Sequence, residues 1–101
     1  MSDPRAFLEL DRLVHEPARL AILSVLAPLD RAEFKFVERL TGLTKGNLSA
    51  QAQKLEAAGY IQVHKGYRGR VPLTEFSLSE AGRRALSEYW SLVERLKPAD
   101  T

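Results

Sequence analysis

Apolar residues in the first third of the chain recur at helical spacing. Phe7, Leu10 and Val14 form one stripe, which begins after Asp3-Pro4, a favourable helix cap and first turn. Pro17 then opens a second, strongly apolar segment that ends at Pro28. The pattern predicts helices over about residues 4–16 and from Pro17 to the residue before Pro28.

The next segment predicts shorter elements. Residues 29–33 form a polar connector that includes the carboxylates of Asp30 and Glu33, for which a solvated loop is an adequate explanation. Phe34 fits a short strand. A short third helix follows over Phe36–Leu40, and Gly42 closes it.

The fourth helix has the clearest boundaries. Thr44 is suited to its N-cap, the helix runs from Lys45 to about Ala58, and Gly59 suits a left-handed C-terminal cap. At about 100° per residue, one side of this helix gathers the apolar residues Leu48, Ala52 and Leu55. We expect that side to pack on the second helix, Leu40 and Leu43.

Strand-like residues replace helical spacing after Gly59. Tyr60, Ile61 and Val63 predict a strand, residues 66–72 a turn-rich tip, and residues 73–78 a return strand. Ser79 is suited to cap a last helix that continues to about Leu96.

The resulting order is α-α-(β)-α-α-β-β-α, which is mainly α with a small β-hairpin. Two helices joined by a short turn and followed by a hairpin predict a winged helix-turn-helix. We expect one domain over residues 1–101, with the helix-turn-helix and wing in 34–78 and dimerisation helices near 4–16 and 79–97. No α/β enzyme fold uses this order.

Composition narrows the chemistry. The chain has 101 residues, no cysteine and only two histidines, His15 and His64, so we expect no metal site and no cofactor. His15 is expected to cap the end of the first helix. No glycine-rich phosphate loop and no nucleophile–base constellation is present, which argues against an enzyme. Without a long apolar run or a signal-peptide pattern, the expected location is the cytoplasm, with no membrane partner.

The formal net charge is only +2, but its distribution is uneven. Between Ala57 and Thr74 the charged residues are Lys65, Arg68 and Arg70, and all are basic. Interleaved glycines permit a tight tip, and arginine suits a narrow minor groove or a phosphate. We expect these three side chains to contact DNA. The alternative is a solvated β-turn.

The polar arc of the fourth helix faces away from its apolar side. Gln53 fits adenine, Ser49 can bond several bases, and Ala50 fits a thymine methyl group. The amides at the helix start, together with Lys45, favour a phosphate. We therefore expect DNA contacts from Lys45, Gly46, Asn47, Ser49, Ala50, Gln53 and Lys54. The alternative is a solvent-facing surface, along which Lys54 only extends its stem.

The last helix carries more apolar surface than one small domain requires. Pairing with the first helix across a two-fold axis would bury it. We expect a homodimer interface made by Phe7, Leu10, Val14, Leu86, Tyr89, Trp90, Val93 and Leu96. The alternative is that the stripe packs entirely within its own subunit.

Three segments resemble a compact group of bacterial and archaeal winged-helix transcriptional regulators related to the MarR and ArsR families. They are LVHEPARLAIL at 13–23, LTKGNLS at 43–49 and KLEAAGYI at 54–61. A fourth segment, RVPLTEFSLSEAGRRAL at 70–86, matches the group's second wing strand and the start of its last helix. The resemblance implies a small dimeric DNA binder that dimerises through its terminal helices. Relatives often carry Arg or His just after the NLS segment, where this chain has Ala-Gln-Ala-Gln. The number of direct base contacts is therefore open.

These observations favour a dimeric, sequence-specific regulator of transcription that binds double-stranded DNA and represses by occupying its site. Two alternatives have different partners: a winged-helix module that binds protein, and an RNA binder. A small-molecule effector would have to lodge between the terminal helices and the DNA-binding core, because we expect residues 1–101 to form a single domain.

Overall fold

The computed structural model describes residues 3–98, and most of its elements begin and end at the caps that the sequence indicates. Their order is η1 (Pro4–Glu9), α1 (Pro17–Leu26), β1 (Ala32–Glu33), α2 (Phe34–Thr41), α3 (Lys45–Ala57), β2 (Ile61–Arg68), β3 (Val71–Leu78) and α4 (Glu80–Leu96).

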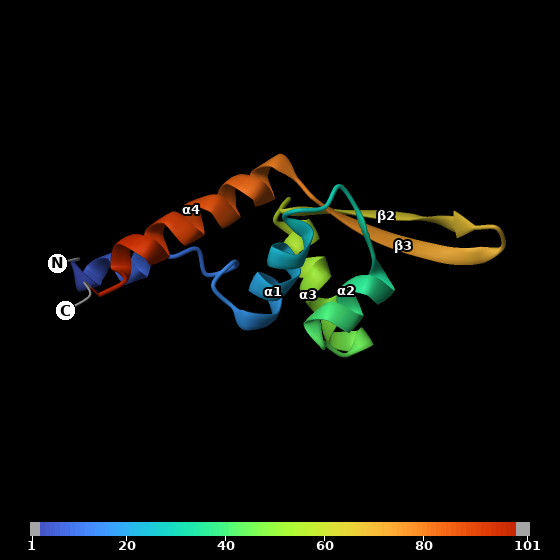
Figure 1. Ribbon diagram of the computed structural model, residues 1–101, viewed down its shortest axis with the longest axis horizontal. Helices are drawn as coiled ribbons and strands as arrows, with labels where there is room; N and C mark the ends of the chain where they lie inside the picture. Colours follow the sequence, from blue (N-terminus) through green and yellow to red (C-terminus); the bar gives the residue numbers. More distant parts are fainter. Residues whose placement is uncertain (1–2, 99–101) are drawn as a thin grey trace.

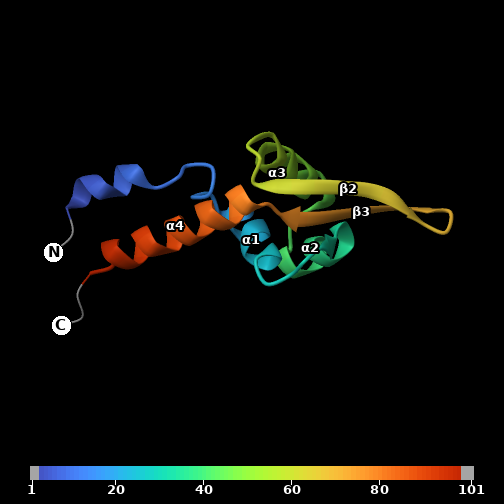
Figure 2. The same ribbon diagram turned by 90° about the horizontal axis from the view of Figure 1, so that it is seen from above.

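The molecule is elongated, with principal extents of 57 × 24 × 22 Å. Helices α1, α2 and α3 form its centre, the β2–β3 hairpin projects at one end, and η1 lies beside α4 at the other (Figures 1 and 2). The core lies between the three central helices and the base of the sheet. Its fully buried side chains include Ile22, Leu23, Leu26, Val37, Leu48, Leu55 and Phe76.

The caps of α3 and α4 explain why these helices start where they do. Thr44 Oγ1 accepts a hydrogen bond from the amide of Asn47 at 3.1 Å, as expected for the N-cap of α3. Ser79 Oγ accepts from the amide of Gly82 at 3.0 Å and donates to the carbonyl of Gly59 at 2.5 Å. The predicted starts of both helices are therefore confirmed.

The wing is longer than predicted. Strands β2 and β3 pair without interruption from Ile61↔Leu78 to Arg68↔Val71, which leaves Gly69 and Arg70 as a two-residue turn. The prediction of a turn-rich tip over residues 66–72 was wrong. Gly69 alone supplies the positive φ (63°) that a tight hairpin turn requires, so the other residues remain free to pair.

The first helix is much shorter than the predicted span of residues 4–16. It is a 3-10 helix that ends at Glu9, since Asp11 Oδ1 accepts from the amides of Leu13 (2.9 Å) and Val14 (3.3 Å) and so fixes a turn. His15 does not cap that helix: its Nδ1 lies 2.8 Å from the hydroxyl oxygen of Tyr89 in α4.

The segment before the helix-turn-helix also differs from expectation. The short strand lies at Ala32–Glu33, where it pairs with Phe76 and Glu75 of β3, and Phe34 is already the first residue of α2. The Phe34 ring packs against Phe76 with centroids 5.7 Å apart, which accounts for its apolar character without a strand. Leu40 was expected to pack on α3 but is 57% exposed.

Candidate nucleic-acid interface

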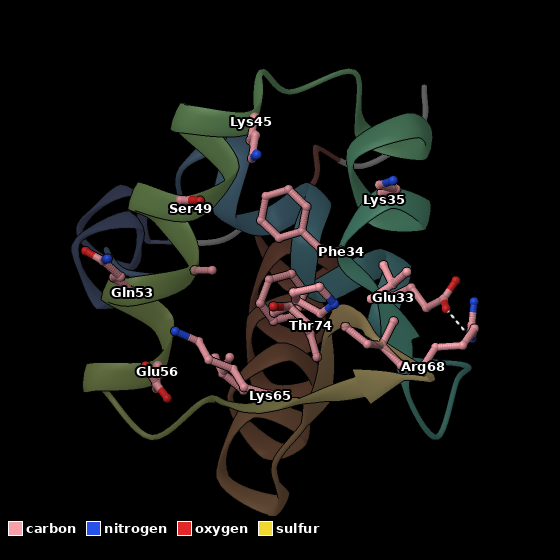
Figure 3. A pocket seen from close by; sticks show the side chains of 16 residues that line it. Glu33, Phe34, Lys35, Lys45, Ser49, Gln53, Glu56, Lys65, Arg68 and Thr74 are labelled. Atoms are coloured by element: carbon pink, nitrogen blue, oxygen red, sulfur yellow. Dashed lines mark hydrogen bonds and ion pairs between the residues drawn. The ribbon is translucent and has the colours of Figure 1, made fainter.

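One face of α3, the start of α2 and the inner side of the hairpin enclose a groove of about 720 Å³ (Figure 3). It is lined by Glu33, Phe34, Lys35, Lys45, Ser49, Ala52, Gln53, Glu56, Val63, Lys65, Arg68, Val71, Pro72, Leu73, Thr74 and Phe76. Residues from both halves of the helix-turn-helix and from the wing thus meet at a single surface.

The groove side of α3 carries Lys45, Ser49, Gln53 and Glu56, spaced by four, four and three residues (Figure 3). This spacing places them in one row along the helix. Lys65 points toward this row from β2 (Figure 3). A polar row therefore faces a basic side chain across the groove.

The predicted two-sided character of α3 is present in the structure. Leu48, Ala52 and Leu55 are buried, whereas Lys45, Gly46, Asn47, Ala50, Gln53 and Lys54 are exposed and Ser49 is half-buried. The polar arc divides into two parts, however. Lys45, Ser49 and Gln53 line the groove, while Asn47 and Lys54 lie outside it, on the flank that faces α1.

The three predicted wing residues occupy different places. Lys65 and Arg68 line the groove from β2, and Arg70 lies at the exposed turn of the hairpin. Within residues 3–98, Arg70 forms no hydrogen bond or ion pair. Its guanidinium is therefore available at the most protruding point of the wing.

Arg68 is not free in the same way. Its Nη2 donates to Glu33 Oε1 of β1, in an ion pair whose side chains are 71% and 37% exposed. The sequence interpretation assigned Glu33 to a solvated loop and so missed this contact. Only the pairing of β1 with β3, which is a long-range feature, brings Glu33 beside the wing.

The groove is cationic overall. Lys35, Lys45, Lys65 and Arg68 face Glu33 and Glu56, so four positive and two negative side chains leave a net charge of +2. Lys35 and Glu56 were not among the predicted site residues. A concave surface with this excess focuses its own positive field and raises the local concentration of anions.

An exposed apolar surface lies at the end of the molecule opposite the wing. Phe7 is 53%, Leu8 75% and Trp90 48% exposed, and Val93 is half-buried. The other predicted interface residues pack within the chain itself: Leu10, Val14, Leu86, Tyr89 and Leu96 are each at most 9% exposed. Leu8, which the sequence interpretation omitted, is the most exposed apolar side chain among the described residues of η1 and α4.

Two side-chain hydrogen bonds join the arm that precedes α1 (residues 10–16) to Tyr89 of α4 and to Tyr60, the residue before β2. One is His15–Tyr89, and in the other the hydroxyl of Tyr60 donates to Asp11 Oδ2 at 2.6 Å. That bond, together with burial and the nearby negative charge of Asp11, raises the pKa of Tyr60 to about 12. Beside the arm lies a hollow of about 290 Å³, lined by Glu9, Asp11, Ala85, Glu88, Tyr89, Leu92 and Arg95.

Over residues 3–98, no three His, Asp or Glu side chains are grouped so that they could hold a metal ion. Across the same span, no helix combines the length and apolar character needed to cross a membrane.

Known proteins match this chain over most of its length. A family model described as the winged helix DNA-binding domain matches residues 18–96. An uncharacterized protein of Methanocaldococcus jannaschii is 32% identical over 79 residues, which are 77% of this chain and 85% of the relative.

Solved structures share the fold. A transcriptional regulator homologue from Pyrococcus horikoshii OT3 superposes with a TM-score of 0.85 at 24% identity, over 91% of this chain and 93% of that one. A MarR-family transcriptional regulator from Silicibacter pomeroyi has a TM-score of 0.67 at 18% identity, over 96% and 67% of the two chains. The fold expected from the order of elements is confirmed.

Proposed function

Because the chain belongs to the winged helix DNA-binding domain family, we propose that it is a dimeric, sequence-specific regulator of transcription. It binds double-stranded DNA, carries no catalytic activity and represses by occupying its site. The observation that carries this proposal is the groove of net charge +2 between α3 and a wing that ends in the unpaired Arg70.

In the proposed complex α3 enters the major groove. Gln53 is exposed at the edge of the protein groove and has the paired donor and acceptor that adenine requires. Ser49 lies one turn earlier on the same row, and exposed Ala50 lies beside it, short enough for a thymine methyl group. Lys45 and the amide of Gly46 meet a phosphate at the helix start.

The wing supplies contacts that do not depend on sequence. Arg70 projects from a two-residue turn, a shape that fits a minor groove. Arg68 leaves its ion pair with Glu33 and binds a phosphate oxygen instead, so one anionic partner replaces another. Lys65 contributes its charge from β2.

The proposed dimer forms through the exposed apolar surface of η1 and α4, centred on Phe7, Leu8, Trp90 and Val93. This surface lies at the opposite end of the long axis from the wing (Figure 1). A two-fold axis there leaves both wings outermost. Two copies of α3 about 34 Å apart would then meet successive major grooves of a palindrome.

An effector, in this scheme, occupies the hollow of about 290 Å³ beside η1 and α4. The hollow adjoins both the arm and the surface proposed for dimerisation. A molecule bound there would act on the relative position of the two subunits.

The salt dependence of binding to duplex DNA tests the central proposal. If about four basic groups per subunit neutralise phosphates, the slope of log K against log salt is about −7 for the dimer. The duplex for this measurement comes from selection of bound sites out of random sequence. A slope near zero, or no enrichment of any duplex, contradicts the proposal.

Two measurements separate the rival functions: competition by RNA and binding of duplex DNA at different salt concentrations. An A-form RNA duplex excludes a helix from its deep, narrow groove, so equal competition by RNA at physiological salt favours an RNA binder. A protein-interaction module instead predicts that duplex DNA binds only at very low salt.

A further inference from the structure

Arg19 of α1 is a nearly buried cation with partners on three sides. Its side chain is 13% exposed. Nε donates to the carbonyl of Leu13 at 2.6 Å, Nη2 to the carbonyl of Arg12 at 3.4 Å, and Nη1 to Gln51 Oε1 at 2.8 Å. Glu16 Oε2 lies 3.7 Å from Nη1 and balances the charge. Arg19 thus joins the arm that precedes α1 to the flank of α3.

Gln51 continues this chain of hydrogen bonds along α3. While its Oε1 accepts from Arg19, its Nε2 donates to Asn47 Oδ1 at 3.1 Å, one turn earlier. Gln51 is half-buried and Asn47 is exposed. This series of hydrogen bonds therefore runs from the interior of the protein to the surface of the proposed recognition helix.

Arg19 determines which groups donate and which accept along this series of hydrogen bonds. A guanidinium has only donors, so Gln51 must turn its oxygen toward Arg19 and its NH₂ group toward Asn47. Asn47 must in turn offer its oxygen to Gln51. Its own NH₂ group is then the part of the amide left to face outward.

The surroundings of Asn47 suit an acceptor-only partner. Asn47 lies in the first turn of α3, where the amides of Lys45 and Gly46 lack partners within the helix. It lies outside the groove, on the α1 flank, so it is placed for the DNA backbone rather than for the bases next to Gln53. Phosphate oxygens only accept hydrogen bonds.

We propose that Arg19 and Gln51 are positioning residues that hold the Asn47 amide with its NH₂ group toward a DNA phosphate. The inference rests on the proposed function and adds to it a backbone contact whose polarity is set from inside the protein. The same chain couples the arm to the DNA-facing surface, because Arg19 also holds the carbonyls of Arg12 and Leu13.

A double-mutant cycle tests the coupling on the duplex recovered by selection. Gln51→Leu should weaken binding about three- to tenfold, the effect of one lost hydrogen bond, when Asn47 is present. In the Asn47→Ala background the same change should have no effect. Equal losses in both backgrounds overturn the inference, because Gln51 would then act only through the general structure of α3.

Gln53→Leu is the matched control, since it makes the same substitution two residues along the helix at a side chain that faces the groove. Its effect should add to that of Asn47→Ala. Thermal unfolding is measured for each variant, and Gln51→Met repeats the cycle if Gln51→Leu does not fold. If the wild-type protein binds no duplex, the proposed function fails and the inference falls with it.

Replacement of single phosphates by uncharged methylphosphonates identifies the partner. One such position should weaken wild-type binding but leave the Asn47→Ala variant unaffected. Gln51→Leu should reduce the loss at that same position. If Asn47→Ala instead changes the preferred base at one position and responds to every methylphosphonate as wild type does, the phosphate assignment is wrong.

Discussion

Glu33 shows how a single side chain can moderate a basic surface. It lines the groove and pairs with Arg68, so one of the four groove cations already has an anionic partner before DNA arrives. An exposed pair of this kind contributes at most about 1 kcal/mol. Breaking it on binding therefore costs little, yet the carboxylate remains close to any incoming phosphate.

We predict that Glu33→Gln strengthens binding to duplex DNA, by about two- to fivefold per subunit, because it frees Arg68 and removes a repulsive charge. Titrations at several salt concentrations measure the change. Glu75→Gln is the control: Glu75 is the register partner of Glu33 and pairs with Arg31, but it does not line the groove. Equal gains from both substitutions would mean that only net charge matters.

At the scale of elements, the wing and α4 approach each other closely where they join. A Cβ atom added at Gly82 would lie 2.0 Å from the carbonyl oxygen of Tyr60 and 2.9 Å from Leu78 Cδ1. The start of α4 is therefore in direct contact with the start of β2. Ser79, through its bond to the carbonyl of Gly59, secures the same junction.

We predict that Gly82→Ala lowers the free energy of unfolding by about 1–3 kcal/mol or more, because backbone atoms must shift to admit the methyl group. Chemical denaturation gives the value. Gly46→Ala serves as the control, since nothing lies within 4 Å of a Cβ built there, and it should not destabilise. An unchanged stability for Gly82→Ala would contradict the close approach.

Elements marked by local signals could be predicted from the sequence. Caps such as Thr44 and Ser79, and glycines at positive φ such as Gly42 and Gly59, act within a few residues, so α2 to α4 end close to the expected positions. The extent of the first helix could not be predicted in this way. The carboxylate of Asp11 accepts a hydrogen bond from the backbone amide of Leu13, which competes with helical hydrogen bonding, and it also accepts one from the hydroxyl of distant Tyr60.

The candidate site divides in the same way. The exposed arc of α3 follows from helical spacing, and the basic wing follows from composition. Other parts of the site depend on long-range contacts. Glu33 and Arg68 are 35 positions apart in the sequence, and Arg19 and Gln51, which link the Arg19–Gln51–Asn47 hydrogen bonds to α1, are 32 positions apart. No local pattern encodes such contacts. Helical spacing places Gln51 nearer the core edge of α3, so it was not among the predicted site residues.

At the scale of the whole molecule, the main feature is that the basic wing and the exposed apolar surface lie far apart along the long axis. The wing lies at one end, and η1 and α4 lie at the other (Figure 2). The basic groove is formed by α2, α3 and the wing, whereas the exposed apolar side chains belong to η1 and α4. Trp90, packed edge-on against Tyr89 with centroids 5.1 Å apart, presents much of its indole to solvent. A second copy covering it would leave both grooves accessible.

We predict that Trp90→Glu converts the dimer to a monomer, because a buried interface would then have to desolvate two unpaired carboxylates related by symmetry. Light scattering coupled to size-exclusion chromatography measures the mass, and circular dichroism checks the fold. Affinity for a palindromic duplex should fall toward that for a half-site, since each monomer must bind without its partner.

Leu40→Glu is the matched control for assembly. Leu40 is 57% exposed, comparable to Trp90 at 48%, but it lies on α2 near the middle of the molecule (Figure 1). This variant should remain dimeric. A wild-type protein that elutes as a monomer would contradict the proposed dimer, and a Trp90→Glu variant that still dimerises would place the subunit contact elsewhere. Either result would remove the geometric argument for a palindromic site.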